Sequence, residues 1–254
     1  MFRHPLLSPA HYDALYEAGS LGLWDGMAAR EDSKLIRHRL AGLDGHVIDA
    51  LDVGCYTGQL LLSFPKSFRL HGVEPNREAA RVSRSKGVEI VADTVAGLEA
   101  VDRQFDVITA CDVIEHVANP LAFLEQLARK LKAEGRLFVT TGNCDSWFWR
   151  FAGARFWYSY FAEHISFIGE RWLQMMPGRI GLEMVDFCRF NYLGGNLRMP
   201  RLAAASLYRF SPSLYKSLRN VLLPPAADVI PVGCGATRDH MLFVLRHARQ
   251  GRSN

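Results

Sequence analysis

One short stretch of the chain, residues 51–62, constrains the fold more than any other. An apolar run over residues 47–53 comes first, Gly54 and Gly58 then frame a short turn, and apolar residues return at positions 60–64. This order predicts a buried strand, a tight turn and the start of a helix. Such a turn presents backbone N–H groups and the positive end of a helix to a ligand. A glycine pair alone is weak evidence, because many turns and β-bulges contain one.

The chain after this turn alternates between short apolar runs and amphipathic stretches. Four more strands are expected at residues 69–73, 88–92, 105–110 and 136–141, and two helices at residues 76–86 and 120–132. A series of this kind predicts an α/β fold, in which a parallel sheet carries helices on both faces. In open sheets of parallel strands, ligands bind beyond the carboxyl ends of the strands.

Polar residues stand at the ends of the first four predicted strands. They are Asp52 with Gly54, then Glu74, then Asp93, and finally Cys111 with Asp112. A single acid after a strand usually caps a helix or forms a turn. Because the carboxyl ends of parallel strands meet at one edge of the sheet, these four positions together predict a ligand site there.

The types and spacing of these residues indicate a nucleoside ligand without phosphates. Glu74 lies 16 residues after Gly58, where an acid accepts hydrogen bonds from ribose hydroxyls in dinucleotide-binding folds. Tyr56 occupies the place in the turn where a pyrophosphate requires a small residue, which disfavours a nicotinamide-dependent dehydrogenase. Asp93 is placed to accept from an adenine amino group. These features together favour S-adenosylmethionine.

The central hundred residues, 47–142, resemble the class I S-adenosylmethionine-dependent methyltransferases, especially the bacterial small-molecule branch. The segments that carry the resemblance are Leu-Asp-Val-Gly-Cys-Tyr-Thr-Gly (51–58), His-Gly-Val-Glu-Pro-Asn (71–76) and Phe-Asp-Val-Ile-Thr-Ala-Cys-Asp-Val-Ile-Glu-His-Val (105–117). Tyr56 is a departure, since the family usually has glycine there. The resemblance implies a Rossmann-like seven-stranded sheet of order 3-2-1-4-5-7-6 with strand 7 antiparallel. Residues 183–192 and 240–247 would supply the sixth and seventh strands.

The resemblance also implies a set of cofactor contacts, with S-adenosylmethionine as methyl donor and S-adenosylhomocysteine as product. The residues carried over are Asp52 and Gly54 near the methionine part, Glu74 at the ribose, Asp93 and Thr94 near the adenine, and Cys111 and Asp112 where strand four ends. Cys55, Tyr56, Gly58 and Pro75 are also expected to bind the cofactor. No metal site is predicted.

Two histidines are candidates for a general base, which assists methyl transfer to a hydroxyl. His164 follows an aromatic-rich segment, residues 147–161, and its Glu-His-Ile surroundings are similar to an element of the acceptor pocket in related enzymes. It is the preferred base or orienting group, and a packed histidine that holds the loop is the alternative. His116 is the second candidate, for which a structural role is favoured. The aromatic residues belong either to the core or to a pocket for an apolar or ring-bearing acceptor.

The chain is expected to have three parts. Residues 1–46 form an N-terminal helical lid or cap, with a helix at residues 34–43, and residues 47–192 with 238–248 form the methyltransferase core. Residues 193–237 form a helical insertion between the last two strands, with helices at residues 201–210 and 213–223. The insertion is both basic and apolar, so it is either an ordinary capping subdomain or a surface for an anionic or lipid-linked acceptor.

Composition and charge exclude several other classes of protein. The net charge of +4 is small, basic residues are dispersed and no Asn-Pro-Pro-Tyr or Asp-Pro-Pro-Tyr tetrad occurs, so nucleic acid is not an expected partner. No apolar run approaches the roughly 18 residues that a transmembrane segment needs. The first nine residues lack a signal-peptide core, and the five cysteines are scattered without metal-type spacing. These features predict reduced thiols in a cytoplasmic protein.

The leading hypothesis is a methyltransferase that moves a methyl group from S-adenosylmethionine to a small molecule. An oxygen of a sugar, a quinone-like compound or a natural product is the expected acceptor, and a homodimer is compatible with the sequence. The alternative, motivated by Tyr56, is a non-catalytic binding protein that keeps the fold.

Overall fold

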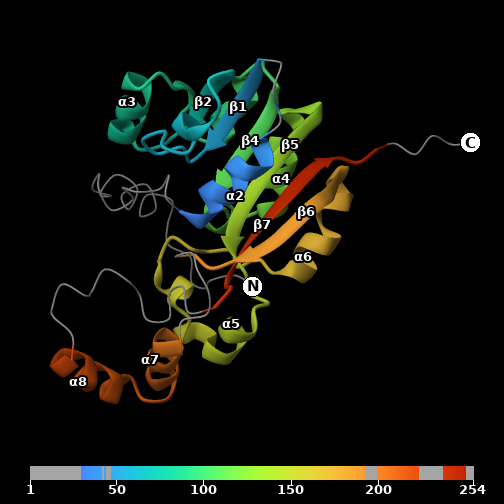
Figure 1. Ribbon diagram of the computed structural model, residues 1–254. Helices are drawn as coiled ribbons and strands as arrows, with labels where there is room; N and C mark the ends of the chain where they lie inside the picture. Colours follow the sequence, from blue (N-terminus) through green and yellow to red (C-terminus); the bar gives the residue numbers. More distant parts are fainter. Residues whose placement is uncertain (1–29, 42, 44–46, 193–198, 223–236, 250–254) are drawn as a thin grey trace, which may run out of the picture.

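A single twisted sheet forms the centre of the computed structural model, which describes residues 30–41, 43, 47–192, 199–222 and 237–249 (Figure 1). Among these residues, seven strands pair in the order β3-β2-β1-β4-β5-β7-β6. Their bounds are β1 Ile48–Val53, β2 Phe68–Val73, β3 Glu89–Ala92, β4 Phe105–Cys111, β5 Leu131–Gly142, β6 Leu182–Phe190 and β7 His240–His247. Strands β1 to β5 are parallel, whereas β7 runs antiparallel to both β5 and β6. The predicted fold class and strand order are confirmed.

The helices that the structure describes are mostly short. They are α2 Glu31–Leu40, α3 Arg77–Ser85, α4 Pro120–Arg129, α5 Trp147–Ala152, α6 Glu170–Met175, α7 Met199–Phe210 and α8 Pro212–Leu222. The side chains of Asn76 and Asn119 accept hydrogen bonds from the backbone N–H groups three residues later, which caps α3 and α4. Helix α4 ends three residues earlier than expected, because β5 already begins at Leu131. None of these helices is long and apolar enough to cross a bilayer.

Each face of the sheet is covered by a hydrophobic core of its own. Along β7, Phe243 points into the core beneath α4 and α6, whereas Leu242 and Val244 point to the opposite core beneath α2. This alternation follows from the two-residue period of a strand, and both sets are apolar because both faces are covered. The central strands are therefore mostly apolar, although they also bury polar residues such as His71 and Thr109.

One expected element is absent: no α-helix follows Gly58. The segment after it contains only a 3₁₀ turn at Leu61–Ser63. Phe64 has extended backbone angles, φ −77° and ψ 161°, because it precedes Pro65 and a residue before proline avoids the helical region. The chain thus stops the helix before it forms a full turn. Within the turn itself, the N–H groups of Gly54 and Cys55 donate to the carbonyl oxygen of Val73, and the N–H group of Tyr56 donates to Glu74, so the turn is held against the end of β2.

Other segments agree closely with expectation. Helix α2 takes the place of the helix predicted at 34–43, and α7 and α8 lie where the insertion helices were predicted. Figure 1 shows α5, α7 and α8 beyond the carboxyl ends of β4 and β5. Most of the predicted lid, and residues 193–198 and 223–236 of the insertion, lie outside the described residues. The division into three parts stays a prediction.

Candidate functional site

The turn after β1 contains two glycines in the left-handed region of backbone conformation. Gly54 and Gly58 both have a φ of +76°. A Cβ at Gly54 would lie 2.9 Å from Val113 Cγ2, and a Cβ at Gly58 would lie 2.7 Å from Ser83 Oγ. Both positions therefore need glycine for conformation and for space. Tyr56 also lies in the left-handed region, with φ 49°, which is a strained conformation for a residue with a side chain.

Glu74 holds this turn against the end of β2. Its carboxylate is buried and accepts hydrogen bonds from Tyr56 N at 2.7 Å and Asn76 N at 2.9 Å. Burial raises the pKa of Glu74, while these two hydrogen bonds act in the opposite direction. A carboxylate has about four lone-pair sites, so Glu74 has acceptor capacity beyond these two hydrogen bonds.

A cleft opens at the carboxyl ends of β1 and β4. Its lining residues are Asp32, Ser33, Asp52, Gly54, Cys55, Tyr56, Gln59, Leu60 and Cys111. Asp52 is buried and accepts a 2.6 Å hydrogen bond from Thr109 Oγ1. Burial raises the pKa of Asp52 to about 7, and the nearby negative charges of Glu74 and Asp32 act in the same direction. The cleft is therefore lined by two carboxyl groups, Asp52 and Asp32, that interact electrostatically.

Five of the residues predicted to bind the cofactor line this cleft, and the others lie around it. Asp93 and Thr94 are exposed at the end of β3, where Thr94 Oγ1 accepts a hydrogen bond from Gly97 N. Pro75, Gly58 and Asp112 are not part of the lining. Asp32 and Ser33 were missed, because nothing in the sequence places the first turn of α2 over the end of β1.

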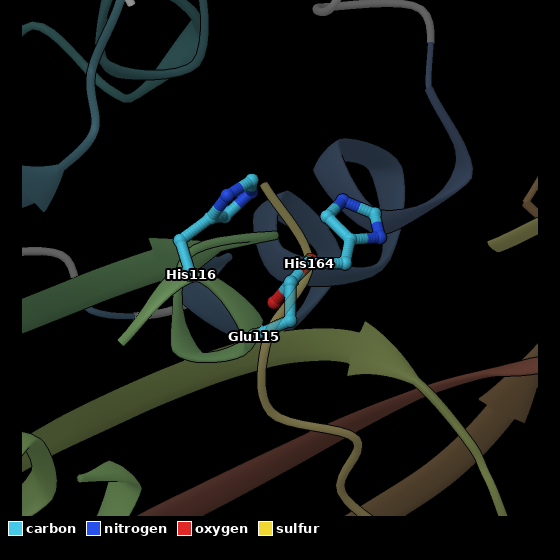
Figure 2. Close-up of side chains that lie close together, drawn as sticks. All are labelled: Glu115, His116 and His164. Atoms are coloured by element: carbon cyan, nitrogen blue, oxygen red, sulfur yellow. The ribbon is translucent and has the colours of Figure 1, made fainter. Parts of the chain in front are cut away.

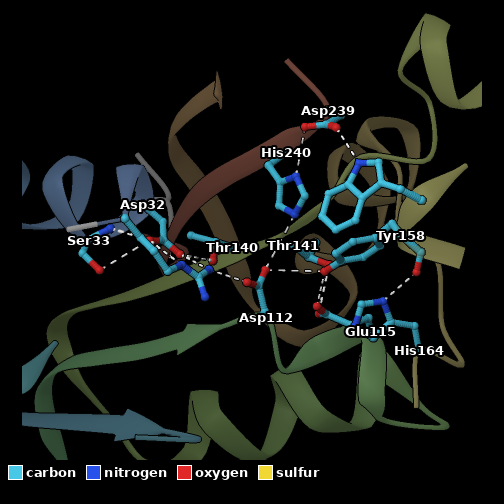
Figure 3. Close-up of polar contacts among 12 residues, drawn as sticks. Asp32, Ser33, Asp112, Glu115, Thr140, Thr141, Tyr158, His164, Asp239 and His240 are labelled. Atoms are coloured by element: carbon cyan, nitrogen blue, oxygen red, sulfur yellow. Dashed lines mark hydrogen bonds and ion pairs between the residues drawn. The ribbon is translucent and has the colours of Figure 1, made fainter. Parts of the chain in front are cut away.

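Asp112, directly after β4, is tied to the residue that precedes α2. It has a φ of 52° and pairs with the partly buried guanidinium of Arg30, which also pairs with Asp32. Figure 3 shows Asp112 and Asp32 at this edge. Burial raises the pKa of Asp112, but the positive charge of Arg30, together with His240, outweighs burial and leaves the pKa lowered. Arg30 thus connects the start of α2 to the acidic edge, and its guanidinium lies 4.9 Å from the ring centre of Tyr192.

Glu115 lies fully buried behind Asp112. It accepts hydrogen bonds from the hydroxyls of Tyr158 and, at 3.0 Å, Thr141 (Figure 3). Burial raises the pKa of Glu115 to about 8, and the charge of Asp112 adds to this effect. Its backbone carbonyl accepts from Ile165 N and Ser166 N, so this residue fixes the segment that carries His164.

The two predicted histidines lie together beside Glu115 (Figure 2). The rings of His116 and His164 are 4.8 Å apart and nearly perpendicular. His164 Nδ1 lies 2.9 Å from the carbonyl oxygen of Tyr158, so Nδ1 carries the proton and donates it. Burial lowers the pKa of His116, and it lowers that of His164 to about 3.

These three side chains have the chemistry of a metal site. Ligand atoms of Glu115, His116 and His164 lie within 4.8 Å of one another. One carboxylate and two imidazoles form a set suited to zinc or another transition metal. A cation here would compete with the Tyr158 and Thr141 hydroxyls for Glu115. The sequence predicted no metal, and among the described residues this is the group that could hold one.

Most of the aromatic segment is core. Phe148, Trp149, Phe156, Trp157 and Tyr158 are buried in one cluster, in which Trp149 stacks on Phe156 at 4.5 Å. Three members are exposed instead: Trp147, Phe151 and Tyr160. Of the two expected roles, packing accounts for the buried members, which wall the region around Asp112 and Glu115.

Sequence reasoning missed a buried acid–histidine pair at the start of β7. Asp239 and His240 are fully buried, and Asp239 Oδ1 lies 3.2 Å from His240 Nδ1. His240 pairs with Gly142 at the end of β5. Because β7 is antiparallel, its first residue lies at the edge where β1, β4 and β5 end. The signal in the sequence is a polar pair directly before the apolar run 241–245.

Comparisons with known proteins agree with this geometry. Residues 28–186 match the model of a methyltransferase domain family. Ubiquinone biosynthesis O-methyltransferases are similar to this chain: that of Parvibaculum lavamentivorans is 38% identical over 103 residues, covering 37% of this chain and 40% of the relative. That of Proteus mirabilis is 30% identical over 131 residues, which cover 48% of this chain and 53% of the relative. The chain thus spans about half the length of these relatives, or less.

Solved structures with low sequence identity share the fold. A chain from a complex between a methyltransferase activator and a putative methyltransferase of Haloferax volcanii has a TM-score of 0.61 at 15% identity, covering 94% of this chain and 98% of the other. The plantazolicin methyltransferase in complex with S-adenosylhomocysteine has a TM-score of 0.53 at 16% identity, covering 86% and 82%. The family match spans well over half of the chain, and the resemblance seen in the sequence motifs is confirmed: the chain belongs to the methyltransferase domain family.

Proposed function

We propose that this protein transfers a methyl group from S-adenosylmethionine to a hydroxyl of a small, ring-bearing acceptor. The observation that carries the proposal is the acidic cleft at the ends of β1 and β4, in a chain of the methyltransferase family. The similar relatives are named as O-methyltransferases, which supports oxygen as the methylated atom.

The residues of the cleft fit this methyl donor. S-adenosylmethionine carries a sulfonium and an ammonium group, and the carboxylate of the buried Asp52 offers negative charge for them, whereas Asp32 in the same cleft already pairs with Arg30. Gly54 lines the cleft with a φ of +76°, and the space beside its Cα is filled by Val113, so glycine keeps the turn in this shape at the cleft. Glu74 has acceptor capacity for the ribose, and Asp93 and Thr94 lie at the next strand end for the adenine. The donor supplies an activated methyl group, and the protein supplies alignment and exclusion of water.

The experiment that tests this function is calorimetry combined with a methyl-release assay. Glu74→Ala should weaken binding of S-adenosylhomocysteine by at least tenfold, because the turn loses its anchor and the ribose loses its acceptor. His164→Ala should lower turnover while binding stays near normal, because His164 holds the wall of the acceptor region. Absence of binding and of methyl transfer by the wild-type protein would reject the proposal.

An apolar, lipid-linked or anionic acceptor is the class that the surface supports. Phe210 is 74% exposed and Leu214 is 50% exposed on α7 and α8, and Trp147 nearby in α5 is 59% exposed. Exposed Arg155 and Lys216 add positive charge to the same end of the molecule. Exposed apolar groups with basic neighbours suit contact with an anionic lipid surface.

Vesicle sedimentation tests this part of the proposal. The double variant Phe210→Ser, Leu214→Ser should lose binding to vesicles that contain phosphatidylglycerol. Leu62→Ser is the matched control, since Leu62 is 42% exposed outside α7 and α8. Equal binding by wild type and the double variant would exclude this surface.

A second candidate function is a non-catalytic protein that binds S-adenosylmethionine. The observation that favours it is Tyr56, whose φ of 49° strains a position usually held by glycine in the family. Binding of S-adenosylhomocysteine without methyl release to any acceptor of a phenol and sugar panel would support it. Methyl release would exclude it.

We propose a reducing compartment such as the cytoplasm for this protein. The cysteines that the structure describes, Cys55, Cys111, Cys144 and Cys188, are all free thiols, which supports the proposal. The homodimer stays a prediction, which sedimentation equilibrium tests.

A further inference from the structure

A line of polar contacts crosses the aromatic cluster and ends at the acidic edge (Figure 3). The indole Nε1–H of Trp157 donates to Asp239 Oδ2 at 2.9 Å, and Asp239 Oδ1 faces His240 Nδ1 at 3.2 Å. On the other side of the ring, His240 Nε2 lies 4.0 Å from Asp112 Oδ1. The line therefore runs from the cluster around α5 to the residue that follows β4.

The contacts determine which nitrogen of His240 carries the proton. A carboxylate only accepts hydrogen bonds, so Nδ1 must be the donor to Asp239. In the neutral ring Nε2 then carries the lone pair, and among the described residues Nε2 has no hydrogen-bond partner. The 4.0 Å distance to Asp112 is too long for a direct hydrogen bond. A buried histidine thus presents an unpaired basic nitrogen towards the edge where the cofactor and acceptor would meet.

The neighbours of His240 hold its ring in place. The Trp157 ring stacks on the His240 ring with 5.6 Å between the ring centres and an interplanar angle of 21°. The ring centres of Tyr158, Phe190 and Tyr192 lie 4.7 to 5.7 Å from that of His240. The charged or titratable groups that face it are the carboxyls of Asp239 and Asp112 and the hydroxyls of Tyr158 and Tyr192. His164 also lies close enough to interact with it electrostatically. Aromatic walls exclude water, which strengthens hydrogen bonds inside.

We infer that His240 is the general base of the methyl transfer and that Asp239 is its positioning residue. The inference rests on the proposed function. The acceptor hydroxyl donates its hydrogen bond to Nε2 beside Asp112. As the O–H bond breaks, the proton goes to Nε2 and the oxygen forms a bond to the methyl carbon. The carbon–sulfur bond breaks with its electron pair left on sulfur, which becomes a neutral thioether. The imidazolium then lies between two carboxylates, and Asp112, whose side chain is 15% exposed, offers a route for the proton to solvent.

His164 is less suited to this step. Its Nδ1–H donates to a neutral backbone carbonyl, whereas the Nδ1–H of His240 donates to a carboxylate. A carboxylate stabilises the imidazolium that forms during proton transfer, and a carbonyl does so much less. Burial also lowers the pKa of His164 to about 3. This leaves His164 with the other roles expected for it, an orienting group or a packed histidine that holds the loop.

The first experiment compares His240→Asn with His71→Asn in the full chain. Asparagine at 240 keeps a donor near the position of Nδ1 but has no group at the position of Nε2. His71 is a matched control, since it is also buried beside carboxylates, Asp49 and Glu89, none of which lines the cleft. With hydroquinone, catechol and methyl glucoside as acceptor probes, His240→Asn should lower methyl transfer about 100-fold or more. Its affinity for S-adenosylhomocysteine should stay within threefold of wild type. A rate within threefold of wild type would overturn the inference.

The second experiment needs no acceptor and no activity. Nitrogen-15 NMR of histidine-labelled protein reports which ring nitrogen carries the proton. The inference requires the Nδ1–H form for His240, and Asp239→Asn should disturb it because the new amide can donate to Nδ1. Asp239→Asn should also lower kcat about 10-fold or more with little change in KM, while Asp239→Glu restores part of it. An Nε2–H form in the wild-type protein would overturn the inference, even if no acceptor is found. Wild-type protein that binds no S-adenosylhomocysteine would reject the proposed function, and the NMR result would still decide the state of His240.

Discussion

Asp52 gives the sharpest test of the cleft as a site for a cationic ligand. Burial raises the pKa of its carboxyl from 3.8 to about 7. At about 1.4 kcal/mol per pH unit, the ionised carboxylate costs the folded protein about 4 kcal/mol at pH 8. Asparagine at this position removes that cost and still accepts from Thr109, with a loss of about 1 kcal/mol in hydrogen-bond strength. Asp52→Asn should therefore raise the free energy of unfolding by about 3 kcal/mol at pH 8 and weaken cofactor binding.

The sign of the pH dependence distinguishes this reasoning from a general packing effect. Because the folded-state pKa lies above the unfolded value, the wild-type protein loses stability as the pH rises from about 4 to about 7. In urea denaturation, the difference in free energy of unfolding between Asp52→Asn and wild type should grow from about pH 4 to about pH 7 and stay constant above it. Asp49→Asn on the same strand is a control with the opposite expected sign. Burial raises the pKa of Asp49, but Lys132 and Arg69 outweigh burial and leave the pKa lowered. This variant should therefore be less stable than wild type. An advantage of Asp52→Asn that is absent at pH 8, or independent of pH, would refute the reasoning.

Three further substitutions, and a fourth as a control, test the turn and the contact with α2. Gly54→Ala should lower the free energy of unfolding by about 2 kcal/mol and abolish cofactor binding, since the new Cβ is crowded and φ is +76°. Gly87→Ala is the control in the same denaturation assay. Gly87 has a φ of +93° but no atom within 4 Å of the new Cβ, so this variant measures the cost of the backbone conformation without the cost of crowding. Tyr56→Gly should change the free energy of unfolding by less than about 1 kcal/mol, because relief of backbone strain and the greater freedom of the unfolded chain offset each other. Calorimetry should show an affinity for S-adenosylhomocysteine within threefold of wild type. A tenfold gain in affinity would mean that the Tyr56 side chain blocks the cleft. Arg30→Gln should lower the free energy of unfolding by about 3 kcal/mol and expose α2 to limited proteolysis, because the carboxylates of Asp112 and Asp32 lose the cation that pairs with both. Protection of α2 equal to wild type would contradict this.

The sheet was predictable because its strands are buried on both faces. Continuous apolar runs fixed the strand positions, and the bounds expected for the seventh strand, residues 240–247, agree with β7. The missing helix after Gly58 was also readable in principle, since Pro65 restricts Phe64. The start of β5 at Leu131 was not predictable, because residues 131–135 have no strand pattern of their own. Leu131 belongs to the strand because it pairs with Phe105 of β4.

The site was predictable only where it depends on strand ends. The rule for parallel sheets correctly brought Asp52, Cys111 and the glycine turn to one cleft, with Glu74 holding the turn. It could not place Asp32, because the position of α2 over the cleft depends on packing of the helix against the sheet. It also overlooked His240, which reaches the same edge only because β7 reverses direction.

A structure of the protein with S-adenosylhomocysteine tests the central claim most directly. The account predicts that the adenosyl group occupies the cleft, with the ribose hydroxyls on the carboxylate of Glu74, the ammonium group near Asp52 and the adenine beside Asp93. An empty cleft at saturating ligand, with Glu74 and Asp93 turned away from any bound nucleoside, would contradict it.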